Sequence, residues 1–182
     1  MLNYLAGARK QFLYYKSLAD KTFDQVSDEA LFWQHDADSN SIAMMVQHLA
    51  GNMLSRFTDF LESDGEKPWR NRESEFEPVL QTRAEMLAYW EKGWTCLMTA
   101  LDALTDADLD RMVYIRNQGH TVLEAINRQL CHYPYHIGQI VFAGKMLCAG
   151  DWQSLSIPKG GSAAFNAEKF ARDKKRGHFT DK

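Results

Sequence analysis

The spacing of apolar residues is the feature of this sequence that most restricts its fold. In four segments these residues recur at steps of three and four, which places them on one face of an α-helix. The segments run over residues 5–19, 42–60, 87–104 and 122–149. Helices of this kind must bury their apolar faces against one another. The sequence therefore predicts an all-α fold, built as a four-helix bundle.

Capping residues indicate where three of these helices begin. Ser41 is a predicted N-cap, because its hydroxyl is able to accept a hydrogen bond from a free amide of the first helical turn. Thr82 with Glu85, and Thr121 with Glu124, have the spacing of a capping box. In a capping box each of the two side chains accepts a hydrogen bond from the backbone beside the other. These residues therefore predict the starts of the second, third and fourth helices.

Between the helices the pattern changes. The helix after Ser41 is predicted to end just before Asp64, and the last helix is predicted to reach about Ala149. Extended residues flank Asn117-Gln118-Gly119, which predicts a small hairpin or extended arm before the last helix. The loop from Gly65 to about Gln81 is long for a compact domain. Its length predicts either a functional role or a packed excursion over the surface.

Length and charge limit the domain organisation and the classes of partner. A chain of 182 residues predicts one domain, the bundle over 1–150, followed by a C-terminal tail over 151–182 that is packed in part and then flexible. Lys and Arg number 21 against 24 Asp and Glu, a net charge of −3, which predicts no nucleic-acid partner. No apolar run reaches the roughly 18 residues of a membrane span, and the start lacks a secretory layout. We therefore expect a cytoplasmic protein that has no membrane partner.

The three cysteines are Cys96, Cys131 and Cys148. Their number is odd, no two form a Cys-x-x-Cys pair, and each falls in an apolar helical segment, so neither a disulfide framework nor a zinc ribbon is expected. The prediction is that they are reduced core residues, since a free cysteine packs as a small apolar side chain.

Three histidines are candidates for a metal site. His132 and His136 are four residues apart, so on a helix both imidazoles are able to reach one metal ion. At 100° per residue, His48 falls at the margin of the apolar face of the second helix, as the other two do on the fourth. Three histidine ligands leave one position open, which is typical of catalytic zinc. The alternative is that His132 and His136 lie on the helix surface and that His48 is a hydrogen-bonded core residue.

The motif His132-x3-His136-x-Gly138-Gln139, together with His48, resembles the DinB-like superfamily of four-helix bundles. Further matching segments indicate an uncharacterised bacterial branch of it. They are His48–Met53, Ser55–Leu61, Asp64–Arg72 and Leu155–Gly160. The resemblance covers most of the chain, and it implies His48, His132 and His136 as ligands of a divalent transition metal, with zinc or nickel expected first.

The resemblance also implies classes of function. Some members are thiol S-transferases that use bacillithiol or mycothiol, and homodimers are common among them. The expectation for this chain is a homodimeric, metal-dependent thiol S-transferase that uses a low-molecular-weight thiol, or a hydrolase of a small substrate. The alternative is a non-catalytic, stress-related homodimer that binds a metal or another small ligand. No carboxylate lies one turn from either late histidine, so a general base is not evident.

Three polar residues are candidates for contacts near this site. Asn52 lies one turn beyond His48, and Gln139 lies nearly one turn beyond His136, so either is placed to orient a ligand or to form a simple hydrogen bond between helices. Arg56 is placed to anchor an anionic substrate, because a guanidinium pairs with carboxylates through two hydrogen bonds. The alternative for Arg56 is a salt bridge with Asp59 or with a carboxylate of the loop.

Overall fold

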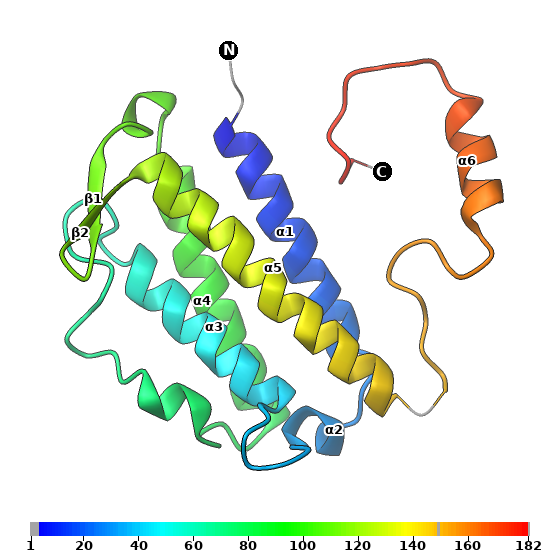
Figure 1. The fold of residues 1–182 in the computed structure, drawn as a ribbon, viewed down its shortest axis with the longest axis horizontal. Helices are drawn as coiled ribbons and strands as arrows, with labels where there is room; N and C mark the ends of the chain where they lie inside the picture. The colour runs from blue at the N-terminus through cyan, green and yellow to red at the C-terminus, as the bar shows by residue number, and fades with distance from the viewer. Residues whose placement is uncertain (1–3, 149, 182) are drawn as a thin grey trace.

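The computed structural model describes residues 4–148 and 150–181. Its chain is mostly helical and includes one two-stranded antiparallel sheet (Figure 1). The elements are α1 (Tyr4–Phe23), α2 (Asp28–Phe32), α3 (Ile42–Phe57), the 3₁₀ helix η1 (Glu73–Phe76), α4 (Arg83–Asp102), the 3₁₀ helix η2 (Asp106–Asp108), β1 (Met112–Ile115), β2 (Gln118–Thr121), α5 (Val122–Leu147) and α6 (Ser162–Phe170). The prediction of a helical fold with a small arm before the last long helix is confirmed.

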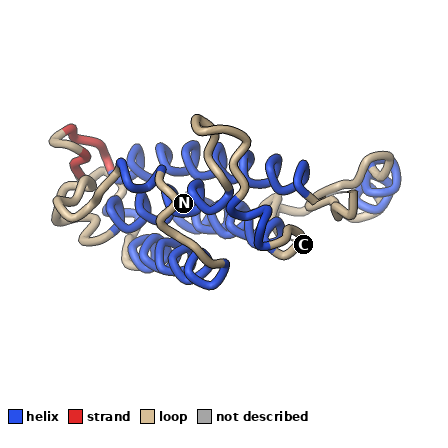
Figure 2. The backbone as a smooth tube through the Cα atoms, turned by 90° about the horizontal axis from the view of Figure 1, so that it is seen from below, coloured by secondary structure: helices blue, strands red, loops and turns tan. Residues whose placement is uncertain are grey.

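The four long helices bury one shared core. α1 packs along α5 and α3 packs along α4, while α3 also contacts α5. Aromatic rings from three of these helices meet edge to face inside, among them Trp90 against Phe23 and against Trp94. Trp90 and Trp94 are 0% and 2% exposed, so both belong to the core. Figures 1 and 2 show the hairpin and α6 on opposite sides of the molecule, with the long helices between them.

The predicted helix starts are confirmed by their hydrogen bonds. The Ser41 hydroxyl accepts from the Met44 amide at 3.2 Å. Both capping boxes form in full at the starts of α4 and α5, at the residues predicted for them. Each box satisfies two amides that a helix start otherwise leaves without a partner. The positions of α3, α4 and α5 therefore follow from local sequence.

Two predicted boundaries are wrong, and both errors have a cause in the backbone. α3 ends at Phe57 rather than just before Asp64, because Asp59 has a φ of 47° and a right-handed helix does not pass through that conformation. The hairpin turns at Arg116 and Asn117, whose φ values are 55° and 60°, so Gln118 and Gly119 belong to β2 rather than to the turn. α5 ends at Leu147, and the predicted end near Ala149 lies outside the described residues.

The prediction that the cysteines are core residues is wrong for Cys131, whereas Cys96 packs against the core. All three are free thiols, but Cys131 is exposed, and Cys96 and Cys148 are partly exposed. Cys131 directly precedes His132 on α5, and one step of a helix turns a side chain by about 100°, here to the outer surface. A short apolar-looking stretch did not reveal this orientation.

The C-terminal segment returns to α1. Lys10 pairs with Asp181 at 2.5 Å, and the ring of Phe179 lies 5.3 Å from the ring of Tyr14. Every side chain of α6 is exposed, and this helix lies apart from the long helices (Figure 1). A domain boundary at residue 150 stays a prediction. Among residues 4–148 and 150–181, no helix combines the length and apolar character that a bilayer crossing requires.

Candidate metal centre

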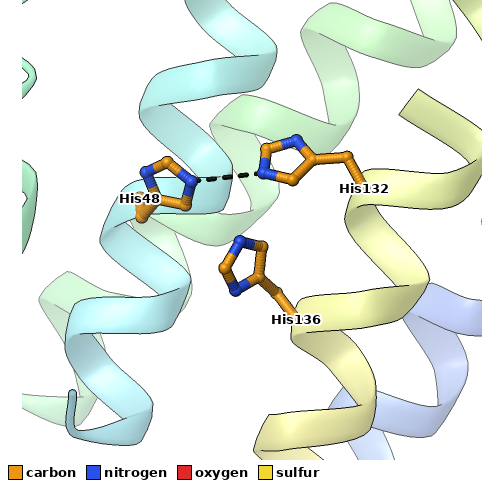
Figure 3. Close-up of side chains that lie close together, drawn as sticks. All are labelled: His48, His132 and His136. Atoms are coloured by element: carbon orange, nitrogen blue, oxygen red, sulfur yellow. Dashed lines mark hydrogen bonds between the residues drawn. The ribbon is translucent and has the colours of Figure 1, made fainter. Parts of the chain in front are cut away.

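Three histidines meet between α3 and α5 (Figure 3). His48 comes from α3, and His132 and His136 come from consecutive turns of α5. One ring nitrogen from each lies within 4.8 Å of one ring nitrogen from the others, and His48 Nε2 lies 3.3 Å from His132 Nε2. Pro134 lies between the two late histidines, and α5 continues as a helix on both sides of it. The structure thus brings together all three histidines that the sequence singled out.

The second nitrogen of each histidine has an oxygen partner. Because each partner is an oxygen that accepts a hydrogen bond, these contacts favour the tautomer with the proton on Nδ1 and the lone pair on Nε2. The pairs are His48 Nδ1 with Glu75 Oε2 at 2.9 Å, His132 Nδ1 with Gln129 Oε1 at 3.2 Å and His136 Nδ1 with Gln139 Oε1 at 2.8 Å. Each Nδ1 thus has an acceptor for its proton, and each Nε2 is the nitrogen placed to bind a metal ion.

The donor set fits a transition-metal ion. His48 Nε2 and His132 Nε2 lie 3.3 Å apart. A tetrahedral ion with metal–nitrogen bonds of about 2.0–2.1 Å holds two nitrogen ligands about 3.3 Å apart. The distance between His48 Nε2 and His132 Nε2 matches this spacing. Three neutral nitrogen ligands suit zinc, nickel, copper or iron rather than calcium or magnesium.

Burial favours the neutral state of two of these rings. Burial is the largest cause that lowers the pKa of His132 to about 3, and the nearby His136 and His48 lower it further. Burial also lowers the pKa of His136, although its hydrogen bond with Gln139 opposes this shift. At neutral pH neither ring needs to lose a proton before it binds a metal ion.

The low pKa of His132 predicts how pH affects the stability of metal-free protein. The folded-state pKa is about 3 against an ordinary value of 6.5, so below pH 6.5 the unfolded chain binds a proton that the folded chain does not. Stability is therefore lost as the pH falls from 6.5. We expect the Tm of chelator-treated protein to fall between pH 7 and pH 5, and the fall to be smaller in His132→Gln. Equal falls in both proteins would contradict this assignment.

The loop from Gly65 to Gln81 supplies contacts that sequence reasoning missed. Its 3₁₀ helix η1 carries Glu75, which accepts from His48, and Phe76, whose ring stacks on the His48 ring with 5.0 Å between centroids. Burial alone would raise the pKa of Glu75, but hydrogen bonds from His48 and Arg70 outweigh it and lower the pKa, so the group is a carboxylate. Glu75 and Phe76 lie in an aperiodic loop, and no sequence pattern indicates their direction.

Gln129 was also missed, although it has a sequence signal. It precedes His132 by three residues on α5, as Gln139 follows His136 by three, and residues three apart share a helix face. A search for hydrogen-bonding residues at this spacing from each histidine would have found both glutamines.

The three predicted neighbours have different surroundings. Gln139 contacts His136, as described above. Asn52 Oδ1 accepts from the Tyr133 hydroxyl at 3.1 Å, which links α3 to α5 rather than reaching a histidine. Arg56 is 7% exposed; it donates to the Gly65 carbonyl and to Glu66 Oε2, the latter at 3.2 Å. Its partner is thus a carboxylate of the loop, the alternative that the sequence left open.

Comparisons with known proteins give one match. A family model described as a protein of unknown function, DUF1572, matches residues 1–161. Neither the search of curated proteins nor the search of solved structures gave a match.

Proposed function

Because the chain belongs to DUF1572, a family of proteins of unknown function, its role has to be inferred from the site, and we propose that it binds a divalent transition metal through His48, His132 and His136 in a DinB-like four-helix bundle. One observation carries this proposal. The Nδ1 atoms of all three rings have oxygen partners, which leaves the three Nε2 lone pairs for one ion. Zinc or nickel is the expected ion, since both accept imidazole ligands.

We further propose that the centre is catalytic, as a thiol S-transferase or as a hydrolase of a small substrate. When bound, the ion would act as a Lewis acid and lower the pKa of a thiol or a water at its open coordination position. The protein's part is to hold the three rings. Glu75 does not supply a free base, because its oxygens accept from Arg70 and His48. This favours a nucleophile that is activated by the ion rather than by a carboxylate.

Non-catalytic metal or small-ligand binding is the second candidate. The burial of His48, which is 5% exposed and covered by Phe76, favours it, because a structural site is shielded from water. Turnover separates the candidates: the catalytic proposal predicts product when metal-loaded protein meets a thiol and an electrophile, or an ester. The homodimer, the low-molecular-weight thiol and the cytoplasmic location stay predictions.

Metal reconstitution tests the binding proposal. Tag-free protein is stripped with a chelator, incubated separately with zinc, nickel, manganese or iron, desalted and measured by elemental mass spectrometry. We expect close to one zinc or nickel ion per chain. A ligand that binds only the folded state stabilises that state by about 2.7 kcal/mol when its free concentration is 100 times its Kd. The Tm of the protein should therefore rise when the same ions are added. Protein that retains none of the four metals would contradict the proposal.

A further inference from the structure

The carboxylate beside His48 is held by a buried arginine. Arg70 Nε donates to Glu75 Oε1 at 2.7 Å, and Arg70 Nη2 donates to Glu75 Oε2 at 2.9 Å. Their side chains are 3% and 6% exposed, so both charges lie in the interior, where each requires the other. A carboxylate gripped at both oxygens has little freedom to rotate. The direction of Glu75 toward His48 is therefore set within the loop.

Helix α3 leaves room for this carboxylate. A Cβ atom built on Gly51 would lie 2.5 Å from Glu75 Oε1 and 3.0 Å from its carboxyl carbon. Any other residue at position 51 must therefore displace the Glu75 side chain. Gln47, one turn earlier, secures the loop to the same helix, since its side chain accepts from the Leu80 amide at 3.3 Å and donates to the Glu77 carbonyl at 3.3 Å. α3 thus carries His48, the space beside Gly51 that Glu75 occupies, and Gln47, which anchors the loop.

The hydrogen-bond partner of His48 comes from a different part of the chain than the partners of the other two histidines. Gln129 and Gln139 orient His132 and His136 from within α5, so those two ligands depend on one helix only. His48 depends on a segment that lies 27 residues away in the chain. Its partner, Glu75, is charged, whereas the partners of the other two histidines are neutral amides. A charged acceptor makes the stronger hydrogen bond.

We propose that Glu75 is a positioning residue that couples the metal to the 65–81 loop. Arg70 holds its carboxylate, and Gly51 leaves room for it because glycine has no side chain. In this position Glu75 fixes the Nδ1–H form of His48 and directs the Nε2 lone pair to the ion. This inference rests on the proposed metal site. A metal on Nε2 makes the Nδ1–H group a stronger donor, so the ion strengthens the contact that docks the loop. By reciprocity, docking of the loop strengthens metal binding by the same factor.

Gly51→Ala is the sharpest test, because it moves Glu75 without removing a charge or a hydrogen-bonding group. Gly138→Ala is the matched control, since a Cβ on this α5 glycine meets nothing within 4 Å. Zinc affinity is measured by competition with a chromophoric chelator. Loss of a ligand's hydrogen-bond partner typically weakens metal binding about 10–100-fold. We expect a loss of this size in Gly51→Ala and in Glu75→Gln, and less than about a twofold change in Gly138→Ala.

Hydrogen exchange supplies a readout that metal affinity alone does not. Amides of the loop donate locally, among them Glu75 to the Arg72 carbonyl and Glu77 to the Ser74 carbonyl. In the wild type and in Gly138→Ala, zinc should slow exchange over Glu73–Phe76; in Gly51→Ala and Glu75→Gln it should not. Circular dichroism confirms that each variant is folded, and Glu75→Gln replaces Gly51→Ala in the comparison if the latter fails to fold.

The outcomes separate this inference from the proposed function. If the wild type binds zinc, but Gly51→Ala and Glu75→Gln bind it as tightly and show the same loop protection, the coupling is wrong and the three-histidine site remains. If the wild type retains none of zinc, nickel, manganese and iron, the metal site is wrong, and the coupling is wrong with it.

Discussion

Replacing His132 and His136 together by alanine is expected to abolish metal binding. The double variant leaves His48 as the remaining nitrogen ligand of the cluster, and a single imidazole in this position does not retain an ion through desalting. Elemental mass spectrometry of tag-free protein should give about one metal ion per wild-type chain and a background level in the variant. A His tag has to be absent, because it binds the same metals.

A matched control shows that the loss is specific to the cluster. His35→Ala removes a histidine whose side chain is 74% exposed and lies outside the cluster, so it should keep the wild-type metal content. The double variant is also expected to show no rise of Tm when zinc is added, since no ion links α3 to α5. A double variant that retains the wild-type metal content would show that the ligands lie elsewhere.

Trp90→Ala is expected to cost about 3–5 kcal/mol of the free energy of unfolding, the usual range for removal of a fully buried aromatic side chain. Trp90 is 0% exposed, its ring lies 5.6 Å from the Phe23 ring and 5.3 Å from the Trp94 ring, and its Nε1 donates to Asp20 Oδ1 at 2.8 Å. The variant leaves a cavity between α1 and α4 and removes the donor to Asp20. Urea denaturation, followed by circular dichroism, measures the loss.

Trp69→Ala is the control for this substitution. The Trp69 side chain is 58% exposed, so most of its surface is already in water in the folded protein. Its removal should therefore cost less than about 1 kcal/mol. A similar loss in both variants would contradict the assignment of Trp90 to the centre of the core.

The fold was predictable where local sequence decides it. Apolar periodicity indicated the four long helices, and the capping residues at Ser41, Thr82 and Thr121 set the starts of three of them. The errors fall at Asp59 and Arg116, which adopt positive φ although neither is glycine. Such residues leave no pattern in a single sequence, because tertiary contacts stabilise the conformation. Asp64, for example, accepts from the Arg116 and Asn117 amides at 2.8 Å each.

The candidate site was likewise predictable only where helical geometry decides it. Helical geometry places His132 and His136 on one face, and the angular position of His48 indicates that it faces the same interior. Glu75 and Phe76 were not predictable, because they reach His48 from a loop whose path depends on Gln47 and Arg70. The three histidines of the cluster thus follow from periodicity, whereas the contacts that orient His48 follow from tertiary packing.

The order of the helices along the chain determines when the three histidines are able to meet. α3 and α4 are neighbours both in sequence and in space, but His48 on α3 lies 84 residues before His132 on α5. At a synthesis rate of about 5–20 residues per second, the ribosome needs about 4–17 seconds to cover that separation. α1 packs along α5, which is also made later in the chain. His48 is therefore made seconds before His132, and the three histidines meet only after α5 has been made.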